Sequence, residues 1–533
     1  MILLQTVPYL RRRDRFTQGD SFGAWVAHQD IARAALQYGS VEGIHFFLPP
    51  GGNYTKEELY DGIGELQEDF PDHRIEIKRL SELGELAKEY HYVLADNFEF
   101  FAQLAFARST MEGSLFPVST IVHTIPDQTA FMGYSNVLVL AEPCDAIVTT
   151  SEAGNRAIRA ILEDVGAFLM SRLEMPAAPE VRIVKIPLAV DEQFLRRRDP
   201  RAARSALNLP LDATIILYLG RLSEAFKADL EPLLNAFRRL ADHPTNPCLV
   251  IAGQDSQNSY SPVVRSLAQE FGVADRVILR TNFPFCDKPL LLSSCDIFAS
   301  PVDNIQETFG LSILEAMATG VPVVGSDWSG YRDLVVPGES GFLARTVWSR
   351  KASRMADLVS AFSVRTRHYL AQHTIVDGED LYRYLNALIA NKELRRQFGD
   401  NGRQRVLSTF CWPVVMARYK ELWREQWSVL QHSSEVKKWI SPVNYNKQFG
   451  HFATMFMQED TLLRSSSDRC LASGLDPKKG RIPNFAGIEE LKRIVSYCRP
   501  EPRSIEELLA SGNDATQSAV AWLWKKGYLE AVS

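Results

Sequence analysis

The chain has 533 residues, more than one hydrophobic core usually serves, so two large domains and a smaller one are expected. Its apolar fraction of 46% and charged fraction of 23% are typical of a globular protein. The net charge of −6 excludes a global basic field that would attract nucleic acid or an anionic membrane.

The cysteines and the apolar runs indicate the compartment. The seven cysteines are scattered without a Cys-x-x-Cys pair, which favours a reducing, cytoplasmic location and argues against structural zinc. The sequence has no run of about 18 apolar residues, so no membrane span is expected. Residues 1–9 precede a basic run, the reverse of a signal peptide, and predict a buried strand. Two basic runs are interpreted as solvated loops: Arg11, Arg12, Arg13 and Arg15, then Arg196, Arg197, Arg198, Arg201 and Arg204.

Apolar runs alternate with helical patterns along the first 190 residues. A helix is predicted over 24–38, and further strands over 41–49, 74–80, 91–96, 119–125, 145–151 and 181–190. This alternation indicates a parallel sheet covered by helices on both faces.

The pattern restarts after the Pro- and Arg-rich stretch 196–212. Strands are predicted over 214–220, 248–253, 276–280 and 296–301, with helices over 230–243, 263–272 and 289–295. The predicted fold class is α/β, with two Rossmann-like domains facing each other across a cleft, where ligands bind beyond the carboxyl ends of the strands. The expected domains are residues 1–205 and 206–411, a closing helix at 412–432 that crosses back, and a linker with a small module at 433–533.

A loop after the strand 214–220 carries two cations. Gly220 allows a tight turn where that strand stops, and Arg221 and Lys227 are expected to project from the loop into the cleft. Two cations there suit a diphosphate, because charge-assisted hydrogen bonds to phosphate are strong.

The segment 296–335 is more specific, because it combines a strand, a helix start and two glutamates. Phe309, Gly310 and Leu311 lie at the predicted helix start, where amides without intrahelical acceptors and the helix dipole favour an anion. Glu307 precedes the helix and can accept hydrogen bonds from sugar hydroxyls. Glu315 interrupts an apolar stretch, so it needs hydrogen-bond partners; its two oxygens suit vicinal ribose hydroxyls.

Both stretches, together with 329–344 and 390–423, resemble the retaining glycosyltransferases of family 4 (glycosyl transferases group 1), which have the GT-B fold. That family carries two glutamates with seven residues between them and a Gly-Arg-Leu loop followed by a lysine, matched here by ETFGLSILE and GRLSEAFK. The resemblance covers roughly residues 1–427. It implies a hexosyltransferase that transfers a sugar from a nucleoside-diphosphate sugar with retention of configuration.

The resemblance also implies roles for matching residues. Arg221 and Lys227 hold the diphosphate leaving group. Glu307 orients the donor sugar, Glu315 binds the ribose, and the main chain of 309–311 contacts the donor. The base is expected near residues 280–282, and His123, at the end of the strand 119–125, near the reacting sugar. The predicted catalytic residues are His123, Arg221, Lys227 and Glu307, and the predicted donor-binding residues are Gly220, Arg221, Lys227, Asn282, Glu307, Phe309, Gly310, Leu311 and Glu315.

Ser151 and Glu152 match a family-like Ser-Glu turn, although Ser151 also suits a helix cap. The early glycine-rich loop is present only as Gly19–Gly23, and the extra segment 348–377 is predicted to be helical. No Asp-x-Asp pair follows a strand, so a reaction without metal or other cofactor is expected. The sequence leaves the base (UDP-, GDP- or ADP-linked) and the acceptor open.

The sequence is also compatible with other functions. A GT-B relative could act as a nucleotide-sugar epimerase or a sugar phosphorylase, or the chain could be a non-catalytic regulator that senses a nucleotide sugar. The tail predicts three short helices and an edge strand, over 488–498, 504–510 and 515–532, which resemble a winged-helix module. Its last helix has few arginines, which favours peptide or protein binding over nucleic acid; a helical cap or an oligomer contact is the alternative.

Overall fold

The computed structural model describes residues 2–6, 23–47, 56–78, 82–83, 90–110, 116–125, 130–174, 180–255, 260–349, 364–432, 457–467, 488–510 and 514–532. They divide into two compact units, Met1–Trp439 and Ile440–Ser533, and each has its own hydrophobic core. The following parts of the sequence lie outside the described residues: the basic run 11–15, the loop residues 19–22, residues 350–363 of the extra segment, one of the seven cysteines (Cys470) and the linker residues 433–456.

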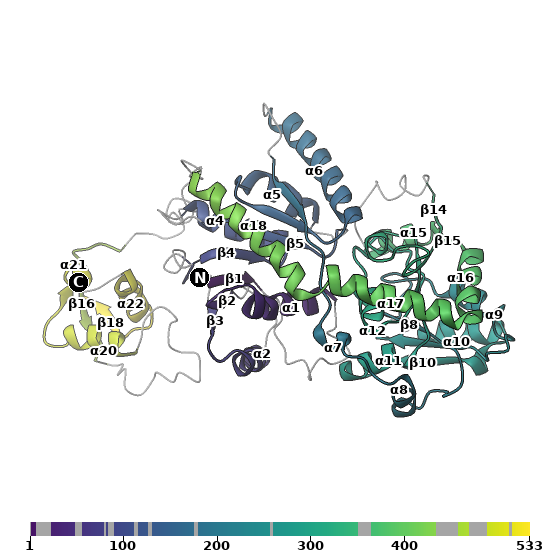
Figure 1. The fold of residues 1–533 in the computed structure, drawn as a ribbon. Helices are drawn as coiled ribbons and strands as arrows, with labels where there is room; N and C mark the ends of the chain where they lie inside the picture. The colour runs from purple at the N-terminus through teal and green to yellow at the C-terminus, as the bar shows by residue number, and fades with distance from the viewer. Residues whose placement is uncertain are drawn as a thin grey trace. The chain divides into compact units, whose positions relative to one another are not determined.

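Seven parallel strands form the first sheet of the larger unit, in the order β3-β2-β1-β4-β5-β6-β7 (Figure 1). The strands are β1 (Ile2–Thr6), β2 (Gly43–Phe47), β3 (Arg74–Lys78), β4 (Tyr90–Ala95), β5 (Val118–Val122), β6 (Ala146–Thr149) and β7 (Arg182–Lys185). The helices between them are α1 (Gly23–Tyr38), α2 (Lys56–Asp69), α4 (Phe98–Thr110), α5 (Ala130–Leu140) and α6 (Glu152–Leu173).

Both faces of this sheet are buried, since successive side chains of a strand point to opposite sides. Leu3 belongs to a core that includes α1 and α18 (Trp412–His432), whereas Ile2 and Leu4 belong to a core with α4, α5 and α6. A sheet covered on both faces needs strands that are apolar at nearly every position, which explains the continuous apolar runs of the sequence.

Six parallel strands form the second sheet, in the order β10-β9-β8-β11-β12-β13. The strands are β8 (Ile215–Leu219), β9 (Cys248–Gly253), β10 (Val277–Thr281), β11 (Ile297–Ser300), β12 (Val323–Ser326) and β13 (Gly341–Ala344). The helices are α9 (Glu231–Arg238), α10 (Ser261–Glu270), α11 (Lys288–Ser294), α12 (Leu311–Thr319), α13 (Tyr331–Leu334), α16 (Gly378–Ala390) and α17 (Lys392–Thr409), with 3-10 turns at Ala274–Arg276 and Phe285–Asp287. Each sheet has the doubly wound order, with a reversal between β1 and β4 and between β8 and β11; ligands bind at such reversals.

The chain passes between the two halves of the larger unit twice, and the two crossings are hydrogen-bonded to each other. The Val190 amide donates to the Phe410 carbonyl oxygen at 2.9 Å, and Val190 bridges to Cys411. After the second crossing, α18 lies on the first sheet, as Figure 1 shows in green. Its Gln426 accepts from the Ser119 hydroxyl at 2.9 Å and donates to the Cys144 carbonyl oxygen at 2.8 Å. The predicted closing helix 412–432 coincides with α18.

Three sequence expectations need correction. The strand predicted over 181–190 ends at Lys185, since Pro187 lacks an amide for the ladder and the chain there becomes the first crossing. The helix predicted over 230–243 ends at Arg238 and continues as tight turns. The extra segment is only partly helical: α15 (Val364–Ala371) lies between β14 (Thr346–Trp348) and β15 (Thr374–Val376), which pair antiparallel.

Arg204 was expected in a solvated loop, and this was wrong. It lies in α8 (Pro200–Ala206) and is 7% exposed. Its guanidinium donates to the Ser294 carbonyl oxygen at 2.8 Å and to the Asp296 carboxylate at 2.7 Å, so α8 packs against α11. This packing joins α8 to the second half of the larger unit. The short α7 (Glu192–Leu195) precedes it.

The smaller unit contains the predicted three helices and edge strand. They are α20 (Ile488–Tyr497), α21 (Ile505–Ala510), α22 (Asp514–Lys525) and β18 (Leu529–Ala531). With β16 (Leu462–Ser465) and β17 (Arg503–Ser504), β18 forms an antiparallel sheet in the order β17-β16-β18. Its likeness to a winged helix and its binding of a peptide or protein stay predictions.

Candidate functional site

A cavity of about 280 Å³ lies at the carboxyl ends of the second sheet's strands, between the two halves of the larger unit. The loops after β8, β9, β10 and β11 and the start of α12 form most of its wall; the first half contributes Val26, His123, Thr124 and the crossing residue Leu188. All ten predicted site residues line it: His123, Gly220, Arg221, Lys227, Asn282, Glu307, Phe309, Gly310, Leu311 and Glu315. The sequence thus identified residues that the fold brings together from four separate stretches.

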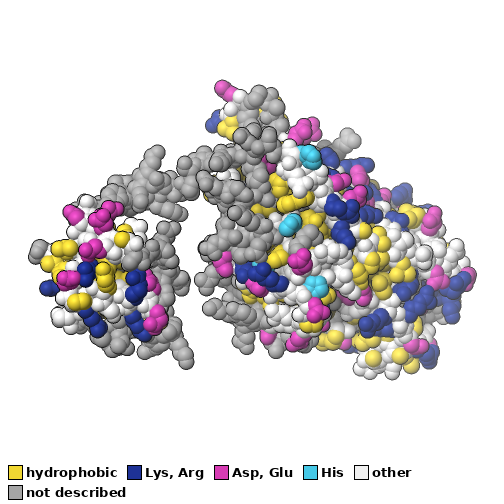
Figure 2. Space-filling view, turned by 60° about the vertical axis from the view of Figure 1, so that its left-hand side comes forward, with side chains coloured by type: hydrophobic (Ala, Val, Ile, Leu, Met, Phe, Trp, Pro, Cys, Tyr) yellow, Lys and Arg dark blue, Asp and Glu magenta, His cyan; other side chains and the backbone are white. Residues whose placement is uncertain are grey.

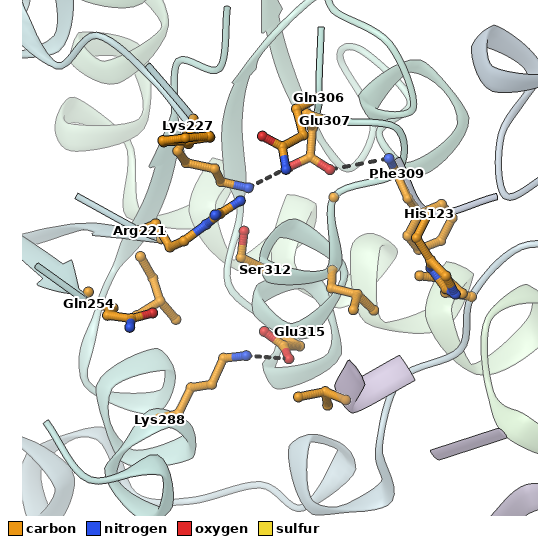
Figure 3. A pocket seen from close by; sticks show the side chains of 18 of the residues that line it. His123, Arg221, Lys227, Gln254, Lys288, Gln306, Glu307, Phe309, Ser312 and Glu315 are labelled. Atoms are coloured by element: carbon orange, nitrogen blue, oxygen red, sulfur yellow. Dashed lines mark hydrogen bonds and ion pairs between the residues drawn. The ribbon is translucent and has the colours of Figure 1, made fainter. Parts of the chain in front are cut away.

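Two glycines position the cationic loop. A Cβ at Gly253, the last residue of β9, would lie 1.6 Å from the Gly220 carbonyl oxygen, so the β8 loop approaches β9 as closely as it does only because residue 253 is glycine. The Leu222 amide then donates to the Gln254 carbonyl oxygen at 2.8 Å. In this loop conformation Arg221 and Lys227 extend over the cavity, as Figure 3 shows.

Glu307 is held from two sides. Lys227 Nζ donates to Oε2, and the Phe309 amide donates to Oε1 at 3.2 Å. Burial raises the pKa of Glu307, but Lys227, the Phe309 amide and Arg221 outweigh it, so the pKa lies below its ordinary value and the group is a carboxylate at neutral pH. Burial lowers the pKa of Arg221, and Glu307 opposes this change. The cations of this site therefore have an internal anion as counter-charge.

The start of α12 is fixed by a turn that requires glycine. Gly310 has φ +108°, and a Cβ there would lie 2.5 Å from Cε1 of Tyr331. The turn directs the first residues of α12 into the cavity, where Ser312 Oγ has no hydrogen-bond partner among the described residues. Amides in the first turn of a helix have no intrahelical acceptor, so this end of the cavity suits an anion.

Glu315, one turn further along α12, is only 5% exposed. Lys288 Nζ, at the start of α11, donates to its Oε1 at 2.6 Å, while Oε2 has no hydrogen-bond partner among the described residues (Figure 3). Burial raises the pKa of Glu315, and Lys288 opposes the rise. One oxygen of this carboxylate is thus left for a hydroxyl of a bound molecule.

His123 follows β5 and is the principal polar group from the first half. Its carbonyl oxygen accepts from Thr308 Oγ1 of the second half at 2.9 Å, and its ring meets the ring of His28 edge-on at 4.6 Å. Burial and His28 place the pKa of His123 well below 6.5, so the imidazole is neutral at pH 7. Its Nε2 has no hydrogen-bond partner among the described residues.

The structure separates the alternatives for two groups of neighbouring residues. The Arg280 guanidinium donates to the Leu207 carbonyl oxygen and does not line the cavity, so of the stretch 280–282 only Asn282 reaches it. Ser151 is the N-cap of α6, accepting from the Gly154 amide at 3.0 Å, and Glu152 pairs with Arg156 and Lys185. The Ser-Glu turn is therefore a helix cap outside the cavity.

Sequence reasoning missed several lining residues, of which Lys288 is the most important. It lies 27 positions before Glu315, and the predicted helix 289–295 gave no sign that its first turn faces α12. Gln254, Phe285 and Gln306 were missed for the same reason, because only the tertiary fold brings their loops to the cavity.

The described residues contain no cluster of three or more His, Cys, Asp or Glu side chains that could hold a metal ion. Independence from metal stays a prediction. Among the described helices none is both long and apolar enough for a membrane span. On the face shown in Figure 2, Lys and Arg side chains lie among Asp and Glu side chains.

Comparison with known sequences supports this site. Residues 199–367 match the family model of glycosyl transferases group 1. This match contains the cationic loop, both glutamates and the start of α12. A D-inositol 3-phosphate glycosyltransferase from Acidothermus cellulolyticus is 31% identical over 176 residues, which are 32% of this chain and 39% of the relative. The enzyme of that name from Mycobacterium tuberculosis H37Ra is 32% identical over 173 residues, or 34% of its length. The chain thus spans about two fifths or less of these relatives.

Comparison with solved structures extends the likeness to most of the chain. A sucrose-phosphate synthase from Thermosynechococcus elongatus has a TM-score of 0.53 at 19% identity, covering 80% of this chain and 99% of that one. HepE from Anabaena, in complex with UDP and glucose, has a TM-score of 0.56 at 16% identity, covering 80% and 100%. These likenesses show the fold, which is the two-domain GT-B arrangement.

Proposed function

We propose that this chain is a hexosyltransferase that moves a sugar from a nucleoside-diphosphate sugar to an acceptor, with retention and without metal. The observation that carries the proposal is the convergence in one cavity of Arg221, Lys227, Glu307 and Glu315 with the first turn of α12. These groups together match the parts of such a donor: two phosphates, a ribose and a sugar.

Donor binding requires an exchange of partners in this cavity. Lys227 is paired with Glu307. A diphosphate placed near Arg221 and the α12 amides would attract Lys227, and the Glu307 oxygen that it leaves would then accept a hydrogen bond from a sugar hydroxyl. Opposite Lys227, the unpartnered Glu315 Oε2 accepts from the ribose. The donor thereby replaces the Lys227–Glu307 ion pair with one contact to each of these two side chains.

The chemical step breaks the bond between the anomeric carbon and the β-phosphate oxygen and forms a bond from that carbon to the acceptor oxygen, whose proton passes to the departing phosphate oxygen. Charge grows on the leaving diphosphate, where Arg221, Lys227 and the α12 amides are already oriented. His123 is neutral, and its Nε2 has no hydrogen-bond partner within the described part of the chain; it faces the sugar from the other half and can form a hydrogen bond with it.

The comparisons support this assignment without defining the substrates. The matched relatives are named glycosyltransferases, and HepE binds UDP and glucose. UDP-sugars are therefore the first donors to test, before GDP- and ADP-sugars.

The test is a thermal-shift screen of the full chain against UDP-, GDP- and ADP-sugars, since a ligand that binds only the folded state raises its stability. Donors that bind are then followed by NMR for hydrolysis or transfer, with and without EDTA. Release of nucleoside diphosphate and an α-linked product from an α-linked donor, unchanged by EDTA, is the expected result.

Other outcomes would replace the proposal. Sugar release that requires orthophosphate would indicate a phosphorylase, and interconversion of the donor's sugar would indicate an epimerase. Tight donor binding without turnover in the presence of any tested acceptor would indicate a non-catalytic regulator that senses a nucleotide sugar.

A further inference from the structure

The extra segment after β13, comprising β14, α15 and β15, contacts both charged loops of the cavity from outside. None of its described residues, 346–349 and 364–377, lines the cavity. Its two ends are anchored on α16: Arg345 donates to Asp377 at 2.8 Å and to Asp380 at 2.7 Å. These ion pairs hold the start and the end of the segment close together beside α16.

α15 contacts the cationic loop 220–227 through two side chains. Arg367 is 8% exposed, and its Cζ lies 5.4 Å from the centre of the Phe226 ring. Arg221 lies over the same ring, with its Cζ 5.7 Å from the centre. His368 Nε2 also lies 3.2 Å from the Glu224 carboxylate.

β14 reaches the loop that bears Glu307 indirectly, through Trp328, which follows β12. The Trp348 ring stacks on Trp328 at 5.7 Å, and Trp328 Nε1 donates to the Asn304 carbonyl oxygen at 3.0 Å. The Asn304 side chain then donates to the Ala225 carbonyl oxygen at 2.7 Å. The two charged loops are thus joined to each other and to the extra segment.

The shared ring couples Arg367 to Arg221 in two ways. A guanidinium is attracted to an aromatic face, so the buried Arg367 fixes the Phe226 ring on which Arg221 lies. Arg367 also adds a positive charge close to Arg221, which lowers the pKa of Arg221 and strengthens the attraction of the site for an anion. Both effects act on phosphate groups and hardly at all on a ribose or a base.

We propose that the extra segment supports the diphosphate site and that Arg367 is a positioning residue for Arg221, setting the affinity for the donor's diphosphate. This rests on the proposed function. A residue that merely stabilises the fold would weaken binding of a nucleoside and of its diphosphate alike.

The test compares UDP, UMP and uridine binding to the full chain by calorimetry, for wild type and Arg367→Met. We expect the UDP dissociation constant to rise roughly threefold to thirtyfold and that of uridine to change by less than about twofold. Arg367→Lys keeps the charge and should restore part of the loss. Arg238→Met is the control, since Arg238 lies over the Phe271 ring at 5.5 Å in the same domain and away from the cavity.

A second variant keeps the test decisive if Arg367→Met fails to fold. His368→Gln removes the other α15 contact without touching the buried Arg367, and should weaken UDP binding while uridine binding is unchanged. Equal losses for UDP and uridine, or no loss in the folded variants, would overturn the inference. Failure of the wild-type protein to bind any nucleotide would instead reject the proposed function.

Discussion

The two halves of the larger unit have the same strand order but contribute very different groups to the cavity. The second half supplies five charged side chains and a helix start, whereas the first half supplies one neutral histidine and otherwise apolar or uncharged groups. A doubly wound sheet thus fixes where a site lies, while the loops after its strands decide its chemistry. Under the proposed function, the charged half binds the nucleoside diphosphate of the donor, and the first half faces its sugar.

The largest effect should come from removing the charge of the second half. We expect Arg221→Ala with Lys227→Ala to lower turnover by roughly a factor of 100 to 10,000, since each charge-assisted bond to phosphate contributes about 1.5–3 kcal/mol. Transfer rates measured alongside circular dichroism check this. The control is Arg197→Ala with Arg201→Ala, two exposed partners of Asp400 and Asp212. Wild-type kinetics in the site variant would assign donor binding elsewhere.

A smaller effect should follow when only the ribose contact is changed. Glu315→Gln should weaken UDP binding about 10- to 100-fold at pH 7.5, because a hydrogen bond to a charged group is lost. Since burial raises the pKa of Glu315, this carboxylate takes up a proton earlier than an ordinary glutamate as the pH falls, and UDP affinity should decline with it.

Lys288→Met sharpens the same prediction. Loss of its positive charge should raise the pKa of Glu315 further, so the decline in UDP affinity should begin at a higher pH than in the wild type. Calorimetric titrations with UDP between about pH 5 and 8 follow both variants. An unchanged pH profile in Lys288→Met would show that Glu315 is not the titrating group.

The first half should affect turnover rather than donor binding. We expect His123→Gln to lower kcat roughly tenfold while UDP affinity stays within about twofold, because the lost contact is to the reacting sugar. His243→Gln, away from the cavity, is the matched control. Weaker UDP binding in His123→Gln would show that the first half also contributes to donor binding, contrary to this prediction.

The smallest effect should come from Ser151. As an N-cap, its change to alanine should lower the free energy of unfolding by about 1 kcal/mol and leave UDP affinity unaltered. Urea unfolding and calorimetry measure the two quantities, with the exposed Ser205→Ala as control. A change in UDP affinity without a loss of stability would show that Ser151 takes part in UDP binding.

The sequence predicted most where local chemistry is strong. Continuous apolar runs indicated both parallel sheets. Glu315 could be predicted as a buried, hydrogen-bonded carboxylate because it interrupts an apolar helix. The sequence pattern did not indicate contacts between residues far apart in the chain. Lys288 contacts Glu315, and Arg204 contacts Asp296, only because α11 packs against α12 and α8 in the folded protein. Ser151 was ambiguous because a cap and a ligand use the same hydroxyl, and only its bond to the Gly154 amide decides between them.

The paired crossings at Val190 and Phe410 restrict how the halves can move. The hydrogen bond between the two connections holds the crossings side by side, so a rotation about that point would leave it intact. The contact of Thr308 with the His123 carbonyl oxygen and that of Asp333 with the Glu152 amide also join the halves. Under the proposed function, a donor that enters by separation of the halves at these positions has to break both contacts.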